Sequence, residues 1–346
     1  AVLQSPTADG RDSLMADIEK VMSVEDADVE KFMGVERGDI EKIMGVEMPS
    51  LANAWQGDRG VFGGGYSGSA YVNVMDYISI ASIGNSSDFG DLNNTMYYCR
   101  AESSGVGGRI VFYGGYGGSE IAQIDYITTA STGNAQDFGD THGVAGSAHG
   151  ASSNGTRGVF SSGVGGASGG STQPWGYITF ASTGDASAGG NLTAGSNAGG
   201  CGNASRALFA GGAQSGTLQN WIEYFNITST DDGSDFGDLT GVRKSFDIAT
   251  DGTKAVMVGG ENASATLDTM DNVTVATAAN ATDGGDLSSI RNRTATVENN
   301  ASSVFWGTTS SHANGQLDTL NIANNSTADS TYDRYAAAGG GGASGS

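Results

Sequence analysis

The sequence predicts an all-β fold: a six-bladed β-propeller with four-stranded blades, preceded by a short α-helical segment. Three observations lead to this prediction. A repeat fills residues 59–346 at spacings of 50, 48, 49, 48 and 48 residues, each copy holds four strand-like segments, and glycine supplies 57 of the 346 residues against only 3 prolines. Short strands joined by closely spaced turns and repeated at a fixed period are typical of propellers. Because repeats share one continuous core, a hydrophobic content of 38% is sufficient.

The helical segment is predicted from an 11-residue repeat. The units DIEKVMSVEDA, DVEKFMGVERG and DIEKIMGVEMP follow one another from Asp17. Each unit has an aspartate placed to cap a first helical turn and apolar residues at i, i+3 and i+4. We expect three short helices broken at Ser23, Gly34 and Gly45, because glycine inside a helix costs about 1 kcal/mol. One continuous helix in a right-handed supercoil is the alternative.

The apolar stripe of this segment predicts a contact surface, because about thirty residues cannot bury such a stripe alone. We therefore predict an N-terminal arm at 1–16, an attachment and oligomerisation segment at 17–50, a linker at 51–58 and the propeller at 59–346. The candidate contact residues are Ile18, Val21, Phe32, Met33, Ile40, Ile43 and Met44.

Each propeller copy begins with a marker, in which a cation precedes an apolar strand that ends in small residues. The markers RGVFGGG, RIVFYGG, RGVFSSG, RALFAGG, KAVMVGG and SSVFWGT begin at Arg59, Arg109, Arg157, Arg206, Lys254 and Ser302. A second strand follows, such as MDYISIAS from Met75, then an element that carries DFGD in three copies. A fourth element is rich in Ala, Gly and Ser. We predict it to be the innermost strand, because large side chains do not fit where the blades crowd the axis.

The two ends of the repeat array predict closure of the ring. The array enters at Arg59 without an innermost strand and leaves on DRYAAAGGGGASGS, which matches the innermost segments of the other copies. The C-terminal strand should therefore complete blade 1, which removes the open edges of an unclosed sheet. Phe62, Tyr77, Phe89 and their equivalents are expected to fill the space between blades.

The double glycine after the apolar strand, with a DY-type pair on the next strand, resembles kelch-type propellers. The usual blade tryptophan is replaced by Phe89, Phe138 and Phe236. Together with the DIEKIMGVE-like units, the sequence is more closely similar to glycine-rich repeat proteins of tailed bacteriophages, particularly marine and cyanobacterial ones. This resemblance implies a virion structural protein of the tail or tail fibre. Its partners would be other virion proteins and copies of itself, after folding in the host cytoplasm.

Composition argues against several partner classes. A formal charge of −22 disfavours nucleic acid and anionic membranes, because both are polyanions. No apolar run approaches the ~20 residues needed to span a bilayer, and the first residues lack the apolar stretch of a secretory signal. Cys99 and Cys201 fall at different phases of the repeat, so we expect no disulfide and a reducing folding compartment.

Two sets of repeated side chains are candidate ligand contacts. The marker cations Arg59, Arg109, Arg157, Arg206 and Lys254 would form a partial ring near one face of the channel, where they can hold phosphate or an acidic sugar. The alternative is that each cation pairs with a carboxylate of its own or the neighbouring blade. The second set is Tyr66, Tyr71 and Tyr116, in loops of Gly and Ser typical of adaptable contact surfaces. Their rings can stack on sugars, or each can pack on its own blade.

The remaining motifs predict no catalytic residue, metal or cofactor. The DFGD runs collect carboxylates, but they lack the spacing of an EF-hand, so we interpret them as structural turns, with an occasional bound cation as the alternative. Three histidines, His142, His149 and His312, are too few for a convincing zinc site. Matches to glycine-rich phosphate loops carry little weight in a chain with this much glycine.

The sequence therefore predicts a non-enzymatic virion protein, attached through its short repeats and displaying a propeller for contact with the host surface, with a glycan as the candidate ligand. One alternative is a purely architectural tail, neck or filament subunit. Another is a polysaccharide-degrading propeller enzyme. That enzyme would require two carboxylates, or a carboxylate and a tyrosine, at the channel mouth, and we find no acidic pair that breaks the repeat.

Overall fold

The computed structural model describes most of the repeat array and short parts of the N-terminal segment. The described residues are 31–32, 35–36, 42–43, 46–47, 57–333 and 341–344, with gaps at 68, 106–107, 143–145, 147–149, 162–172, 194–197, 300–301 and 309–315. Every regular element in these ranges is a β-strand. Accordingly, this part of the chain contains no helix long and apolar enough to cross a membrane. The chain divides into two compact units, Ala1–Ala54 and Trp55–Ser346.

The described positions of the first unit form two small antiparallel pairs. Strand β1 (Lys31–Phe32) pairs with β2 (Val35–Glu36), and β3 (Lys42–Ile43) pairs with β4 (Val46–Glu47). The predicted helices are therefore not confirmed. A Met-Gly dipeptide separates the strands of each pair in the sequence, and glycine in a two-residue connection is a hairpin signal that competes with the helical spacing. The other residues of 1–56, and the side chains of all seven candidate attachment residues, lie outside the described residues.

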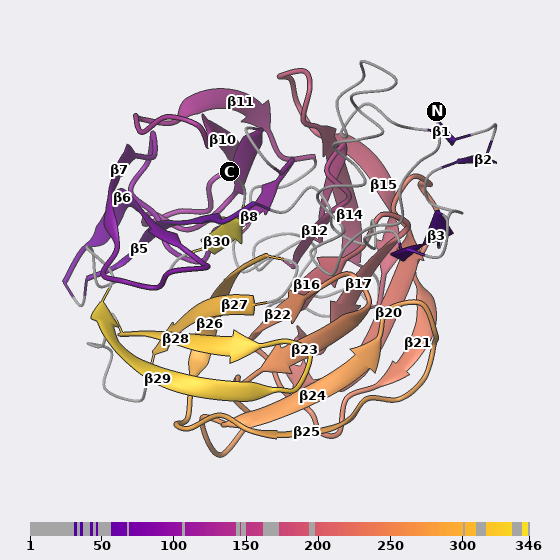
Figure 1. The fold of residues 1–346 in the computed structure, drawn as a ribbon. Coiled ribbons are helices and arrows are strands. Elements are labelled where there is room, and N and C mark those ends of the chain that lie inside the picture. Colours follow the sequence, from indigo (N-terminus) through magenta and orange to yellow (C-terminus); the bar gives the residue numbers. More distant parts are fainter. Residues whose placement is uncertain are drawn as a thin grey trace, which may run out of the picture. The chain divides into compact units, whose positions relative to one another are not determined.

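The second unit consists of six four-stranded antiparallel sheets, the blades, which follow one another around a ring (Figure 1). Blades 1 to 3, from the innermost strand outward, are β30 (Gly341–Ser344), β5 (Arg59–Tyr66), β6 (Tyr71–Ser79), β7 (Ser87–Asp91); β8 (Arg100–Ser103), β9 (Arg109–Tyr113), β10 (Gln123–Thr128), β11 (Gln136–Asp140); and β12 (Ala151–Ser153), β13 (Arg157–Ser161), β14 (Gln173–Thr179), β15 (Ser187–Leu192). Blades 4 to 6 are β16 (Gly199–Gly202), β17 (Arg206–Ala210), β20 (Trp221–Asn226), β21 (Ser234–Asp238); β22 (Asp247–Thr250), β23 (Lys254–Val258), β24 (Thr269–Thr274), β25 (Thr282–Asp286); and β26 (Asn292–Glu298), β27 (Ser302–Thr308), β28 (Gln316–Asn321), β29 (Ser326–Asp333). A short hairpin, β18 (Ala213–Gln214) with β19 (Thr217–Leu218), joins β17 to β20.

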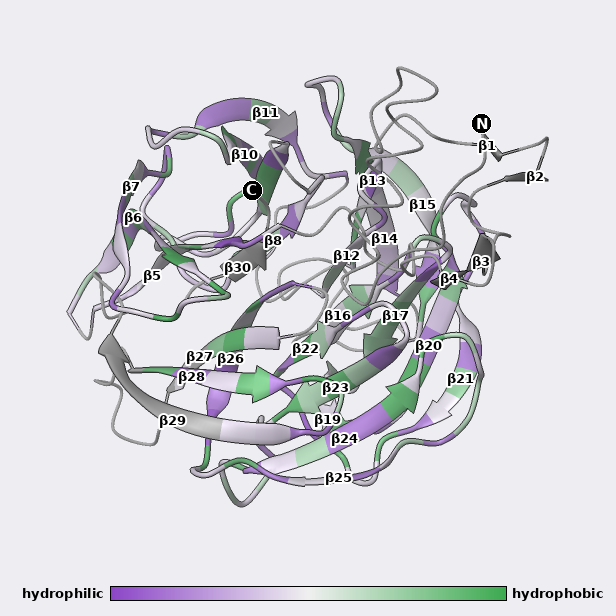
Figure 2. Ribbon diagram, in the orientation of Figure 1, coloured by the Kyte–Doolittle hydropathy of each residue, from purple (hydrophilic) through white to green (hydrophobic). Residues whose placement is uncertain are grey.

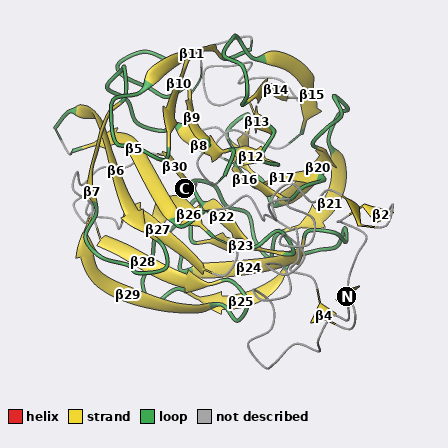
Figure 3. Cartoon of the chain, turned by 45° about the horizontal axis from the view of Figure 1, so that its top comes forward, coloured by secondary structure: helices red, strands yellow, loops and turns green. Residues whose placement is uncertain are grey.

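The ring closes as the sequence predicts. Strand β30 pairs with β5, in a register that places Gly341 opposite Gly63 and Ser344 opposite Gly60. Each innermost strand contacts the innermost strands of both neighbouring blades, and β30 lies between β26 and β8 (Figure 3). The six-bladed propeller, its four-stranded blades and its C-terminal closing strand are thus confirmed.

The core lies between blades. Six clusters of buried hydrophobic side chains occur in the described residues, one at each of the six interfaces between neighbouring blades. Successive side chains of a strand point to opposite faces of its sheet, so Val61 packs toward blade 2 and Phe62 toward blade 6. Hydrophobic and hydrophilic residues both occur along β20 and β24 (Figure 2). Phe62 and Phe89 are buried and Tyr77 packs against the core, as predicted.

The DFGD segments form outermost strands, and these strands are hydrogen-bonded to the next blade. In β7, the Phe89 carbonyl accepts a hydrogen bond from the Gly133 amide at 2.8 Å, and the Asp91 amide donates to Asn134 Oδ1 at 3.1 Å. Gly90 has φ +144°, and a Cβ at this position would lie 2.4 Å from the Gly133 oxygen. The glycine of the motif therefore permits close approach of two blades, which gives the motif a structural role.

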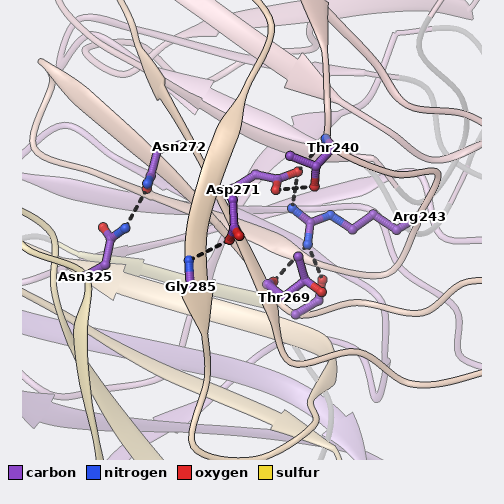
Figure 4. A network of polar contacts seen from close by, with 9 residues as sticks. Thr240, Arg243, Thr269, Asp271, Asn272, Gly285 and Asn325 are labelled. Atoms are coloured by element: carbon purple, nitrogen blue, oxygen red, sulfur yellow. Dashed lines mark hydrogen bonds and ion pairs between the residues drawn. The ribbon is translucent and has the colours of Figure 1, made fainter.

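Buried carboxylates on the third strands add a second link between blades. Asp271 of β24 accepts hydrogen bonds from the Thr240 amide and hydroxyl, at 3.0 and 2.6 Å, and pairs with Arg243 at 2.9 Å (Figure 4). Both partners belong to the linker that leaves blade 4. Asp125 of β10 likewise accepts from the amide and side chain of Asn93, in the linker that leaves blade 1, at 2.9 and 2.7 Å.

Candidate functional site

The antiparallel strand order gives the ring two distinct faces. The loops between the second and third strands of each blade, and the linkers from one blade to the next, lie on the face that we call the loop face. The turns between first and second strands, and between third and fourth strands, lie on the opposite face, the turn face. The two predicted sets of ligand contacts fall on different faces.

The marker cations lie on the turn face, where each one bridges two blades. Arg109 stacks over the ring of Tyr126 in its own blade, 4.6 Å from the centroid, and donates a hydrogen bond to the Phe180 carbonyl of the next blade at 2.6 Å. The corresponding acceptors are Thr129 for Arg59, Ile227 and Ser229 for Arg157, Val275 for Arg206, and Ala323 with Asn325 for Lys254. The acceptors of these bonds are mainly backbone carbonyls of the next blade, where the alternative to a ligand role had been pairing with a carboxylate.

The predicted tyrosines come together on the loop face. Tyr66 and Tyr71 have ring centroids 5.5 Å apart, and Tyr71 lies 5.8 Å from Tyr116 in an edge-on arrangement. Sequence reasoning missed two further members, Tyr97 and Tyr98. The ring of Tyr97 stacks on Tyr71 at 5.3 Å with an interplanar angle of 6°, and the Tyr98 ring follows 4.0 Å from Tyr97. We call these five residues the tyrosine cluster.

Local backbone geometry explains why these rings meet. The double glycine Gly64-Gly65 adopts φ of 66° and 136°, and Tyr66 is then paired directly with Tyr71 across the β5–β6 hairpin. Tyr97, in the linker to blade 2, exchanges two backbone hydrogen bonds with Tyr116 of the β9–β10 loop, at 3.0 and 2.9 Å. Two loops and one linker thus bring the rings together.

A polar group adjoins the tyrosine cluster at the loop-face ends of the innermost strands. Tyr98, Ser245 and Arg293 have φ of 61°, 59° and 52°, a left-handed conformation that is uncommon for residues other than glycine and that occurs often at functional sites. Arg293 lies over the Tyr98 ring, 5.5 Å from the centroid. Glu261 accepts hydrogen bonds from Ser245 at 3.1 Å and from Asn292 at 2.9 Å. We call this end of the ring the channel mouth.

Arg100 crosses the axis of the ring below the channel mouth. It extends from β8 in blade 2, and its guanidinium donates to the carbonyls of Thr294 in blade 6 and Phe246 beside β22 in blade 5, at 3.2 and 3.3 Å. Blade 5 is opposite blade 2 in a six-membered ring. The side chain therefore connects opposite sides of the ring.

Carboxyl groups on three innermost strands lie close enough to interact electrostatically. Burial, reinforced by Glu298 and Asp247, raises the pKa of Glu102 well above its ordinary value. Burial also raises the pKa of Asp247, although Arg100 opposes this shift. No acidic pair that breaks the repeat was singled out from the sequence, whereas these innermost strands carry Glu102, Asp247 and Glu298. The signal was present, since β8, β22 and β26 carry charged residues where β12 and β16 carry Ala, Ser, Gly and Cys.

The other singled-out residues add no further cluster. His142 is exposed on the linker after β11, while His149 and His312 lie outside the described residues. Cys99 and Cys201 are buried and are not joined in a disulfide. Within the described ranges, no group of three His, Cys, Asp or Glu side chains is arranged to hold a metal ion.

Comparison with protein-family models gives no match, and neither does comparison with curated proteins. The class of this protein is defined by its fold, a closed six-bladed β-propeller. Its loop face, with partly exposed aromatic rings beside a polar channel mouth, is compatible with a binding or structural propeller.

Proposed function

We propose that the protein is a non-enzymatic binding propeller of a tailed-phage virion, a tail or tail-fibre component whose loop face contacts a glycan of the host surface. The observation that carries this proposal is the tyrosine cluster, in which rings from two blades lie together and partly exposed. Tyrosine offers a rigid apolar ring and a polar tip, which suits contact with sugars and with other polar surfaces.

The exposure of apolar side chains supports the choice of this face. Among the described residues, the large hydrophobic side chains that stay exposed are Tyr66 at 37%, Val242 at 46% and Ile290 at 39%. All three belong to the loop face, Tyr66 in a loop and the others in linkers. Tyr66 is the one of the three whose ring packs against the other rings of the tyrosine cluster, and a continuous apolar patch marks an interaction surface where single exposed residues do not.

The virion setting is supported by the two unrelated repeats in one chain and their resemblance to phage proteins. A closed ring also suits display outside a cell, since β30 covers the edge of β5 that an unclosed ring would leave unpaired. At the channel mouth, Glu261 is held in place by the donors Ser245 and Asn292 and by Lys244 at 3.7 Å, which positions its oxygens for hydrogen bonds to a bound ligand.

A second candidate function is architectural. Val242 and Ile290 suit a protein neighbour as well as they suit a ligand. In that case the loop face would be packed against another virion subunit and would carry no receptor contact.

A cryo-EM reconstruction of the particle, with mass spectrometry of its proteins, tests the proposal. We expect the protein in purified particles, with its loop face in solvent. A loop face packed between neighbours would favour the architectural candidate. Absence of the protein from the particles would overturn the virion assignment.

A further inference from the structure

Building on the proposed function, we propose that the loop face binds an extended, uncharged oligosaccharide that lies along the tyrosine cluster and ends at the channel mouth against Tyr98, Arg293 and Glu261. This inference names the ligand class and its placement. It rests on the continuity of the aromatic surface, on the polar groups at one end of it and on the charge of the protein.

The aromatic rings form a group that extends toward the channel mouth, and we call this surface the strip. The ring centroids of Tyr66, Tyr71 and Tyr97 lie 5.3 to 6.2 Å from one another. The Tyr98 ring lies 4.0 Å from Tyr97, and the Arg293 guanidinium lies 5.5 Å from the Tyr98 centroid. Four rings together offer more contact area than one sugar ring covers, which favours a chain of several sugars over a monosaccharide.

At its channel-mouth end, the strip is next to both hydrogen-bond donors and hydrogen-bond acceptors. At the channel mouth, Glu261 supplies acceptor oxygens, Asn292 supplies an amide, and Lys244 and Arg293 supply donors. A few convergent polar groups beside an apolar surface fix the orientation of a ligand that has many hydroxyls. Arg100 spans from blade 2 to blades 5 and 6 at this end of the ring, which favours a ligand that lies across the face over one that threads through the ring.

Charge decides between an uncharged and an acidic oligosaccharide. The chain has a formal charge of −22, which repels polyanions. Glu120 and Glu261 both lie near the strip, as their influence on the pKa values of Tyr97 and Tyr98 shows. The local cations Lys244 and Arg293 already engage Glu261 and the Tyr98 ring. An uncharged ligand avoids the repulsion and uses the same hydrogen bonds.

The test is a glycan array of neutral, amino and acidic oligosaccharides of one to eight units, followed by calorimetry on the full chain. We expect neutral chains to bind, with affinity that rises with length to a plateau and changes little with salt. Tyr71→Ala and Tyr97→Ala should each weaken binding about tenfold, whereas Tyr71→Phe keeps the ring and most of the affinity. Val242→Ser, on the same face outside the strip, should bind normally. Thermal melts check that each variant is folded.

The outcomes separate this inference from the proposed function. Preferential binding of acidic glycans, with affinity that falls as salt rises, would overturn the uncharged ligand and leave host-glycan contact standing. Neutral binding that survives both tyrosine-to-alanine changes in folded protein would overturn the placement on the strip. Failure of the wild-type chain to bind any glycan, with the loop face free on the particle, would overturn glycan contact itself.

Discussion

The linkers that leave blades 1 and 4 share one backbone arrangement and carry opposite side-chain chemistry. In the first, Tyr97 exchanges two backbone hydrogen bonds with Tyr116, and in the second Lys244 does so with Glu261, at 3.0 and 2.9 Å in both cases. A residue with positive φ follows each bridge, Tyr98 or Ser245. One bridge thus presents stacked aromatic rings and the other an ion pair. The two linkers thus have the same backbone hydrogen bonds but differ in the side chains that they present.

The anchors beneath the two linkers also differ. Below the blade 4 linker, Asp271 is fully buried and holds both Thr240 and Arg243, while below the blade 1 linker Asp125 holds only the neutral Asn93. The blade 4 linker is therefore tied by a buried charge pair, and the blade 1 linker by hydrogen bonds to one neutral residue.

The largest expected effect comes from removing these anchors. Asp271→Ala should lower the free energy of unfolding by about 3 to 5 kcal/mol, because Arg243 would be left as an uncompensated buried charge. Asp125→Ala should cost about 1 to 3 kcal/mol, since its partner is neutral. Urea denaturation measures both, with the exposed Asp286→Asn as a control. Equal losses at the two sites would contradict this difference.

Replacing the tyrosines of the blade 1 bridge by the ion-pair residues of the blade 4 bridge tests whether the backbone arrangement is independent of the side chains. The double variant Tyr97→Lys with Tyr116→Glu should fold, with stability within about 1 kcal/mol of the wild type, because a partly exposed ion pair contributes little. Its oligosaccharide binding should fall at least about tenfold, since the strip loses its central ring. A variant that folds and binds like the wild type would show that the tyrosines carry no binding role.

A pH titration tests the innermost strands into which the two linkers lead, β8 with Glu102 and β22 with Asp247. A carboxyl whose pKa is raised by folding binds more protons in the folded state. Stability is then greatest below the unfolded pKa and is lost as pH rises toward the raised folded pKa. Glu102→Gln should therefore raise the melting temperature at pH values above the ordinary glutamate pKa of 4.5 and flatten its fall as the pH rises further. Parallel melting profiles for the two proteins would contradict the raised pKa of Glu102.

The smallest effect is expected at the Lys244 bridge itself. The Lys244 and Glu261 side chains are 34% and 25% exposed and 3.7 Å apart, so Lys244→Ala should change the unfolding free energy by less than about 1 kcal/mol. Chemical denaturation in low and high salt measures this. A loss comparable to that of Asp271→Ala would mean that the ion pair holds the linker, contrary to the arrangement described here.

The blade number and the ring closure could be predicted from the sequence because the repeat marks each of them. Six markers predict six blades, and the glycine-rich C-terminus could be matched to the missing innermost strand. In the short N-terminal repeat, local spacing did not predict the secondary structure correctly for the described residues. The i, i+3, i+4 spacing of apolar residues favoured helices, whereas in the structure a Met-Gly dipeptide separates the two strands of each pair. Pairing of Arg109 and its equivalents with the neighbouring blade was one of the two predicted roles, but a backbone carbonyl acceptor leaves no trace in residue type and was not predicted.

The candidate site was only partly predictable. Tyr66, Tyr71 and Tyr116 stand out because they lie in Gly-rich loops, whereas Tyr97 and Tyr98 belong to a linker whose position depends on the packing of two blades. Arg100 and Glu102 break the small-residue pattern of the innermost strands. Their meaning depends on partners up to 194 residues away in the chain, and no local pattern reports such contacts.

The pairing of β30 with β5 also has a consequence for biosynthesis. Gly341 and Gly63 are neighbours in blade 1, but the chain between them must be synthesised first, which at 5 to 20 residues per second takes roughly 14 to 56 s. Throughout this time one edge of β5 has no partner and is open to pairing with other chains. The sequence of β5, RGVFGGGY, is half glycine, a residue poorly suited to strands. A strand of low β-propensity at this position would make pairing with other chains less favourable, and so protect the nascent protein from aggregation until β30 has been synthesised.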